Sequence, residues 1–276
     1  MSELATVGHA HEVHETHEAH PTVTGVSNEK LGMWMFLGSE CLMFGGLIST
    51  YLLYKNRVGS VAGATASPFR PSSFFDIPFT SVSSFVLLAS SMTMVMAVTS
   101  AARHDGPRLR LWLATTAALG SIFIGGQVYE FTGFVHEGRT IRTEVMDQHA
   151  KWESNAVART TPLEVELPSG AKAEVKYVDA GSVSVAVDGG YENIVNPEHI
   201  GMGYTSSTAS SAFFTMTGFH GVHVTVGIIM LLVLLGLSLK RRLNPGRPEV
   251  VEIVGLYWHF VDVVWIVIFT VIYLIK

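Results

Sequence analysis

Ionisable side chains are rare in the long apolar stretches of this sequence, and those present could exchange protons or bind a metal. Glu40 lies in FLGSECLMFGG, while His220 and His223 lie three residues apart in TGFHGVHVTVG. His259 and Asp262 have the same spacing in GLYWHFVDVVW. Residues three apart share one helical face, and ionisable groups in membrane spans are candidates for function. We take these five residues as the centre of the candidate site.

Two further polar residues, Gln127 and Glu130, lie three apart in GGQVYEF. Glu130 is close to the end of its apolar stretch, where we expect interfacial water to solvate it. A helical rise of about 1.5 Å per residue puts Glu40, His259 and Asp262 about 13 to 18 Å from one membrane boundary. The two histidines of TGFHGVHVTVG fall near the middle of their stretch, so we expect these five residues to share one depth.

Three uses of these residues compete. Histidines with Asp262 or Glu40 have the ligand types of a metal or haem site, but their spacing carries no metal-binding signature. Glu40, near the middle of a span, could take up and release protons. Alternatively, all of them could form hydrogen bonds across helix interfaces, where neighbouring glycines allow close packing. We favour the packing use and predict no catalytic residue and no metal ligand in this chain.

The composition indicates a membrane protein. Of 276 residues, 48% are hydrophobic and only 15% are charged, whereas soluble domains carry about 25% charged residues. Such a hydrophobic chain is not disordered, and its net charge of -5 offers no basic surface for nucleic acid. Cys41 is the only cysteine, which excludes an intramolecular disulfide and a zinc-thiolate cluster.

Five apolar stretches are each long enough to cross a bilayer as a helix, which takes about 20 residues. Apolar residues cover every face of these stretches, unlike the alternating strands of a membrane barrel. We therefore predict an all-α membrane protein, a five-transmembrane-helix bundle with a β-rich extracytoplasmic insertion. The predicted spans are Leu31–Tyr54, Phe79–Ala102, Leu111–Thr132, Ala209–Leu239 and Val251–Ile275, so that residues 31–132 contain helices 1 to 3 and residues 205–276 contain helices 4 and 5.

Positive charge in two short loops predicts the orientation. These loops join the second span to the third and the fourth span to the fifth. Their basic residues are Arg103, Arg108, Arg110, Lys240, Arg241, Arg242 and Arg247. Short loops rich in Lys and Arg stay in the cytoplasm, so we expect a cytoplasmic N-terminus and an extracytoplasmic C-terminus.

Residues 133–204 form an insertion that is too long for a simple connection. It contains eleven acidic and six basic residues, an imbalance that would favour a basic soluble partner. LEVELPSGAKAEVKYV is typical of two alternating strands around a turn, and SVSVAVDGGYENI of a third strand. We predict a small β-rich cap; an insertion without any partner is the alternative.

Residues 1–30 form a polar tail in which histidines alternate with glutamates. The histidines are His9, His11, His14, His17 and His20. No short apolar core of a secretory signal peptide is present. His-rich tracts can bind divalent metals, but without apolar residues to fold around we predict a solvated, disordered cytoplasmic tail.

The sequences around the candidate residues resemble one membrane-protein family. FFTMTGFHGVHVTVG and GLYWHFVDVVWIVIF are similar to subunit III of the haem-copper oxidases, the cytochrome c and quinol oxidases of respiratory chains. LGMWMFLGSECLMFGGLISTY resembles the first conserved helix of that family, with Glu40 at its buried carboxylate. SVSSFVLLASSMTM and GGQVYEF resemble the next two segments. The resemblance extends over all five spans and is to the shorter, five-helix bacterial form.

The resemblance implies an accessory subunit that holds no redox centre. In the family it packs against catalytic subunit I, which carries haem and copper, and supports proton uptake. Glu40 matches a family glutamate that reacts with carbodiimides. The family also binds phospholipid between its helices, for which we take Trp258, Arg241 and Arg242 as candidates. The implied partners are subunits I and II, other respiratory-complex subunits, cytochrome c and phospholipid.

We therefore predict an accessory subunit of an oxygen-reducing, proton-pumping cytochrome c oxidase in the bacterial plasma membrane. Haem and copper are expected only in its partner subunits. A quinol oxidase subunit, or an accessory subunit of a nitric-oxide reductase, is the alternative within the family. An autonomous transporter or proton channel is the alternative from a different class.

Overall fold

The computed structural model describes residues 27–55, 77–189, 192–201, 208–240 and 248–274. The histidine-rich part of the tail, and the candidate lipid residues Arg241 and Arg242, lie outside them. Among the described residues, five helices are long and apolar enough to cross a membrane, which confirms the predicted all-α membrane fold. They are α1 (Asn28–Lys55), α2 (Ile77–Ala102), α3 (Gly106–Ser154), α4 (Thr208–Leu239) and α5 (Glu249–Phe269), which continues into a π-helical turn, Thr270–Leu274.

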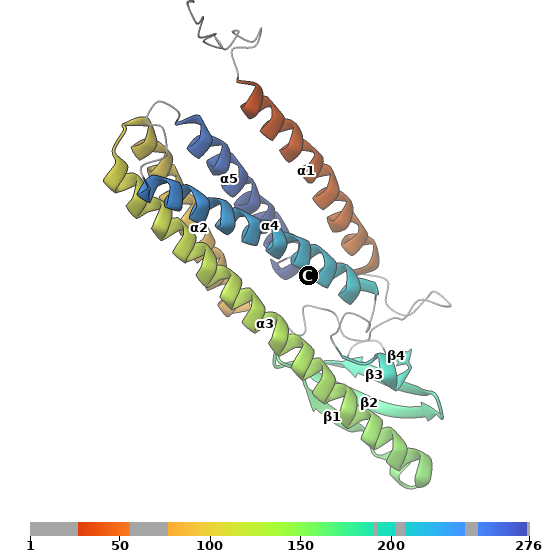
Figure 1. The fold of residues 1–276 in the computed structure, drawn as a ribbon. Helices are drawn as coiled ribbons and strands as arrows, with labels where there is room; N and C mark the ends of the chain where they lie inside the picture. The colour runs from red at the N-terminus through yellow and green to blue at the C-terminus, as the bar shows by residue number, and fades with distance from the viewer. Residues whose placement is uncertain (1–26, 56–76, 190–191, 202–207, 241–247, 275–276) are drawn as a thin grey trace, which may run out of the picture.

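The helices form a bundle with α1 at its edge, in contact with α4 and α5 (Figure 1). A tight turn at residues 103–105 joins α2 to α3, so these two helices pack side by side along most of α2. Asp105 starts α3, because its side chain accepts a hydrogen bond from the Arg108 amide at 3.2 Å. Pro107 follows in the first turn, where a helix needs no amide hydrogen.

Trp258 of α5 packs against three other helices, α2, α3 and α4. Trp258 of α5 is only 1% exposed, and its indole Nε1 donates a hydrogen bond to Ser90 Oγ of α2 at 3.1 Å. A Cβ atom at Gly120 of α3 would lie 2.6 Å from the indole ring, and one at Gly227 of α4 would lie 2.8 Å from it. Only glycine fits at these two positions. The Trp258 indole, which we expected to contact phospholipid, packs between the helices instead.

The third helix does not end at Thr132, as the apolar stretch suggested, but continues for 22 residues to Ser154. Hydropathy hides this extension because only one stripe of it is buried, as in any amphipathic helix. The buried residues recur every three or four positions, at Phe134, Gly138, Ile141, Val145, His149 and Trp152. The first third of the insertion is therefore a helix, and only its later part is β-structure.

The extension of α3 lies against a four-stranded antiparallel sheet in which neighbouring strands follow one another in sequence (Figure 1). Val165 pairs with Ala173, and Val175 with Val185, and all four side chains are buried. The predicted runs around the PSG turn form β1 and β2. The strands are β1 (Leu163–Glu166), β2 (Lys172–Asp179), β3 (Ser182–Val187) and β4 (Asn193–Val195).

The far end of α3 is fastened to the sheet by hydrogen bonds. Trp152 is fully buried and donates from its indole to the Thr161 carbonyl at 3.2 Å. Arg159 donates to the Trp152 carbonyl at 2.7 Å, and its guanidinium lies 4.7 Å from the centre of the Tyr177 ring. His149 bonds to the Asp179 carbonyl at 3.0 Å. These contacts make the helix extension and the sheet one packed unit.

Replacing Gly120 by Ala should destabilise the bundle, because the added methyl group would overlap the Trp258 ring. Overpacking of this kind costs about 1–3 kcal/mol, which should lower the thermal midpoint of the detergent-solubilised protein by several degrees. The matched control is Gly125→Ala on the same helix, where a Cβ meets nothing within 4 Å. Equal thermal midpoints for the two variants would contradict the proposed packing.

Candidate functional site

The structure distributes the candidate residues over three helix interfaces rather than one cluster. Their ionisable and amide groups pair mainly with residues of neighbouring helices, and each interface has its own partners. Glu40 meets His223 between α1 and α4, His259 meets Ser91 between α5 and α2, and Glu130 meets Thr80 between α3 and α2, with Gln127 beside it. A shared depth along the membrane normal therefore did not mean a shared site.

Glu40 and His223 are two ionisable side chains that pair with each other across a helix interface. The Oε2 atom of Glu40 lies 3.1 Å from Nε2 of His223, and each side chain is 15% exposed. The other imidazole nitrogen, Nδ1, lies 2.8 Å from the Phe219 carbonyl. Phe44 places its ring edge against the imidazole, with ring centres 5.3 Å apart. The pair is thus shielded by an apolar side chain at the α1–α4 interface.

The two contacts of His223 limit where protons can lie in this pair. A backbone carbonyl can only accept, so the Nδ1 atom of His223 must carry a hydrogen. The contact between His223 Nε2 and Glu40 Oε2 then needs one more proton, held either by the imidazole or by the carboxyl group. In one case the pair is an imidazolium and a carboxylate, and in the other both groups are neutral. Moving one proton along a 3.1 Å hydrogen bond interconverts these two states.

A second polar group lies between α2 and α5. Ser91 Oγ is 2.6 Å from His259 Nδ1. Asp262, one turn further along α5, is 4% exposed, and its Oδ1 atom has no hydrogen-bond partner among the described residues. Ser91 therefore pairs with His259, and the two ionisable residues of α5 that lie three apart have different surroundings.

His220 has a different environment from its neighbour His223. Its imidazole stacks on Trp265 with ring centres 5.0 Å apart, and Phe123 approaches it edge-on at 6.1 Å. Neither ring nitrogen has a hydrogen-bond partner among the described residues. The side chain is 1% exposed, so it acts here as an aromatic packing element.

Glu130 is not solvated at a helix end, as its position in the apolar stretch suggested, but is only 5% exposed. Thr80 of α2 donates a hydrogen bond to Glu130 Oε1, and Gln127 donates to Oε2 at 3.4 Å. The physical reason is that Thr80, in the first turn of α2, packs against the carboxyl group. Within the described ranges, no three His, Cys, Asp or Glu side chains come together in a way that could hold a metal ion.

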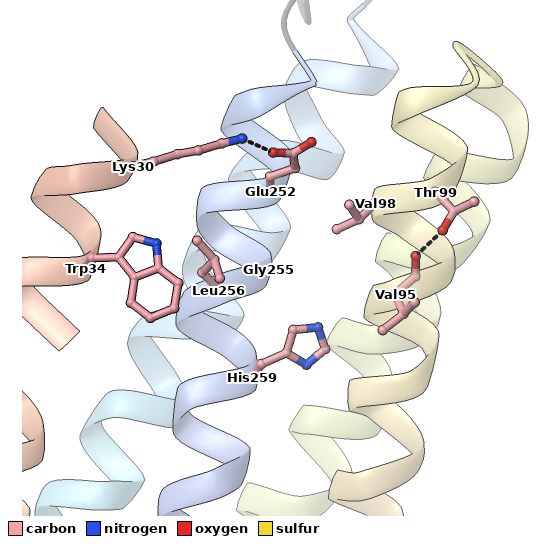
Figure 2. Close-up of a pocket in the computed structure, with 9 residues that line it drawn as sticks. All are labelled: Lys30, Trp34, Val95, Val98, Thr99, Glu252, Gly255, Leu256 and His259. Carbon is pink, nitrogen blue, oxygen red and sulfur yellow. Dashed lines mark hydrogen bonds and ion pairs between the residues drawn. The ribbon is translucent and has the colours of Figure 1, made fainter. Parts of the chain in front are cut away.

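A cavity of about 400 Å³ opens between α1, α2 and α5, at the end of the bundle where α5 begins (Figure 2). Lys30 of α1 reaches across its mouth and forms an ion pair with Glu252 of α5. Trp34 projects from α1 toward α5, and His259 projects from α5 toward α2. The remaining lining is Val95, Val98, Thr99, Gly255 and Leu256. The cavity thus combines an apolar interior with a charged rim.

Charged side chains also pair on the sheet, outside the five predicted spans. Lys176 lies 3.0 Å from a carboxylate oxygen of Glu192 and 3.4 Å from one of Glu174. The hydrogen bond to Glu192 raises the pKa of Lys176, and the same bond lowers the pKa of Glu192. The positive charge of Lys176 is therefore already balanced by these two glutamates.

Several residues of these groups were missed in the sequence. Ser91 and Thr80 are uncharged and lie among many other hydroxyl residues, so no spacing rule distinguished them. Lys30 lies near the beginning of the chain and Glu252 near its end, and each is at the start of a different apolar stretch. Such charges at span ends are common, and only the tertiary structure shows that these two meet.

Comparison with known proteins gives a consistent result. A family model described as cytochrome c oxidase subunit III matches residues 191–276. The chain is 30% identical over 247 residues to the cytochrome c oxidase subunit 3 of Bacillus sp. (strain PS3), covering 90% of this chain and 86% of the relative. It is also 30% identical over 244 residues to the quinol oxidase subunit 3 of Bacillus subtilis (strain 168), covering 88% and 85%.

The two substitutions Glu40→Ala and Glu40→Gln should separate the hydrogen bond from the charge. Alanine leaves the His223 Nε2 without its partner, and buried polar groups in membrane helices lose about 1 kcal/mol in this way. We expect the thermal midpoint of the solubilised protein to fall by about 2–4 °C. Glutamine still offers a hydrogen-bond donor and should stay near wild type.

Ser39→Ala is the control for this pair, because Ser39 is exposed and bonds only to the Phe36 carbonyl of its own helix. It should leave the midpoint unchanged. If Glu40→Ala were as stable as Glu40→Gln, the contact with His223 would contribute nothing to the bundle.

Proposed function

Because the chain belongs to the haem-copper oxidase subunit III family, we propose that it is the accessory subunit of a proton-pumping cytochrome c oxidase and holds no redox centre itself. The observation that carries this proposal is the similarity over nearly the whole length of subunits 3 of two oxidases. Haem and copper would then belong to subunit I and its neighbour subunit II. This chain would pack against them through its helices.

The electron donor is a finer part of the proposal. The relatives include subunits of both cytochrome c and quinol oxidases at the same identity, so similarity does not choose between them. The acidic sheet region, with eleven acidic and six basic residues in 133–204, supports cytochrome c, because an acidic surface steers a basic soluble protein. A quinol donor is the second candidate.

The role that we propose for Glu40 is local proton supply. Its pairing with His223 holds a proton in either of two positions, and each side chain retains 15% exposure. A group of this kind can accept a proton from water and release it to a neighbouring subunit. The alternative of an autonomous proton channel is less well supported, because the polar groups occupy different helix interfaces.

The cavity between α1, α2 and α5 is our candidate phospholipid site (Figure 2). Its apolar lining suits an acyl chain, and the ion pair of Lys30 with Glu252 at the rim suits a polar headgroup. Trp34 is 58% exposed and so could contact lipid, whereas Trp258 is buried. The lipid contacts that we propose are therefore Trp34 and Lys30.

We also propose that the N-terminus is cytoplasmic and the C-terminus extracytoplasmic in the bacterial plasma membrane. Arg103, Arg108 and Arg110 lie at the turn between α2 and α3, on the side that the positive-inside rule assigns to the cytoplasm. The sheet would then face outward. This is also the side on which a soluble electron donor would arrive.

Purification of the native protein in mild detergent tests the proposed function. We expect haem-bearing partners to co-purify with this chain, and the preparation to reduce oxygen with reduced cytochrome c faster than with a quinol. Isolation of this chain alone would refute the subunit assignment. A preference for quinol would refute only the donor.

In the same preparation, Glu40→Gln should leave the visible haem spectrum unchanged, because Glu40 touches no cofactor in this proposal. The variant should lose activity sooner during continuous turnover if the carboxyl group supplies protons. A missing haem band in this variant would show that the residue had been assigned to the wrong role.

The lipid site predicts that Trp34→Ala removes one tightly held phospholipid. Lipid retained per purified chain can be counted by mass spectrometry of the extracted lipid or of the intact protein. Met35→Ala is the matched control, because Met35 is 71% exposed on the same helix and does not line the cavity. Equal lipid counts in the two variants would argue against this site.

A further inference from the structure

A second cavity lies at the opposite end of the bundle, where α3 leaves the membrane and continues toward the sheet. Its volume is about 340 Å³, and it is open along the groove between α3 and α4. The lining residues are Phe131, Thr132, Val135, His136 and Arg139 of α3, with Phe214 of α4. Aromatic side chains therefore line its membrane end, and a histidine and an arginine line its other end.

Helix geometry brings the polar end of this groove onto one face. With about 100° between successive residues, Thr132, Val135, His136 and Arg139 lie within about 100° of one another around α3. Glu137 lies about 100–160° away from them. The carboxylate closest in sequence therefore lies on a different face of α3 from the groove.

The depth of the groove matches the headgroup layer. The apolar part of α3 begins at Leu111, and a helix crosses the hydrocarbon core in about 20 residues, so the boundary falls near Phe131. The Cα atom of Arg139 is about 10 Å beyond Thr132. Helical side chains tilt toward the N-terminus of their helix, which here is toward the bilayer. The Arg139 guanidinium can therefore reach back to the phosphates.

Arg139 has no anionic partner in the part of the chain that the structure describes. Its side chain is exposed and makes no hydrogen bond or ion pair with any described residue. The positions three and four residues away, where a helical partner would lie, are Val135, His136, Arg142 and Thr143. Lys176 on the sheet, by contrast, is already paired with two glutamates.

The charge distribution along the insertion points the same way. The segment next to the membrane, residues 133–143, has two arginines and one glutamate. The rest of the insertion, residues 144–204, has ten acidic and four basic residues. Positive charge is thus concentrated at the membrane surface, in a region that is otherwise acidic.

We propose that this groove binds one anionic phospholipid from the leaflet on the sheet side of the membrane. Arg139 holds the phosphate through paired hydrogen bonds, the geometry at which guanidinium groups excel, and His136 lies beside it. Phe131 and Phe214 flank the upper part of an acyl chain. This site is separate from the cavity of Figure 2, which lies at the other end of the helices.

Native mass spectrometry of the full-length chain with phosphatidylglycerol tests the proposal. We expect Arg139→Gln to retain one phosphatidylglycerol fewer than the wild type, with about a tenfold loss of apparent affinity for that molecule. Arg142→Gln is the matched control, because it removes the same charge one turn further from the membrane and outside the groove. It should bind as the wild type does.

Two further measurements identify the ligand. Arg139→Lys should retain the lipid only in part, because lysine keeps the charge but not the forked geometry. Phosphatidylcholine, which has no net charge, should not fill the site, and inorganic phosphate should not displace phosphatidylglycerol, since it lacks the acyl chain. Equal phosphatidylglycerol counts in Arg139→Gln and Arg142→Gln, equal filling by phosphatidylcholine, or displacement by inorganic phosphate would each overturn the proposal.

Discussion

Several ionisable side chains of the apolar helices meet a polar partner on a neighbouring helix, and these contacts organise the helix bundle. Glu40 is in α1, and its partner His223 is in α4. In the same way, Ser91 of α2 meets His259 of α5. Each pair crosses a helix interface, so satisfying the polar group also decides which helices touch. The proton that we propose for Glu40 and His223 would be held by the same contact that joins α1 to α4.

Close packing of side chains supplies the rest of the stability of the helix bundle. Apolar side chains gain little from leaving the lipid for the bundle, because the lipid is itself apolar. The Trp258 indole fills the space that Gly120 and Gly227 leave open, and it also donates to Ser90. A large ring among small residues makes four helices converge at one point. His220 also stabilises the bundle by packing, because its ring stacks on Trp265.

The third helix passes through two solvents without interruption. Up to Thr132 its exposed faces are mostly apolar, whereas beyond Thr132 they are mostly polar and one buried stripe packs against the sheet and the returning chain. At Gly201 that chain passes so close that a Cβ atom would lie 2.3 Å from the Gly138 carbonyl. The extension spans about 33 Å, and the groove containing Arg139 lies where the environment changes. A rigid helix thus relates the position of the acidic sheet to that of the lipid surface.

The sequence alone determined the number of spans, the helical class, the β-structure around the PSG turn and the family, because long apolar runs and motifs such as GLYWHFVDVVW are local features. It also identified most of the ionisable groups that the helices bury. Only the tertiary structure decided how those groups pair. The depth of a residue depends only on its position along its own helix. A contact between helices depends also on how each helix is rotated and on the order of the helices around the bundle. Helices that are apolar on every face do not specify that rotation or order. For the same reason the predicted third span ended at Thr132, whereas α3 continues to Ser154. The sheet covers one stripe of this extension, and the sheet is formed by residues further along the chain.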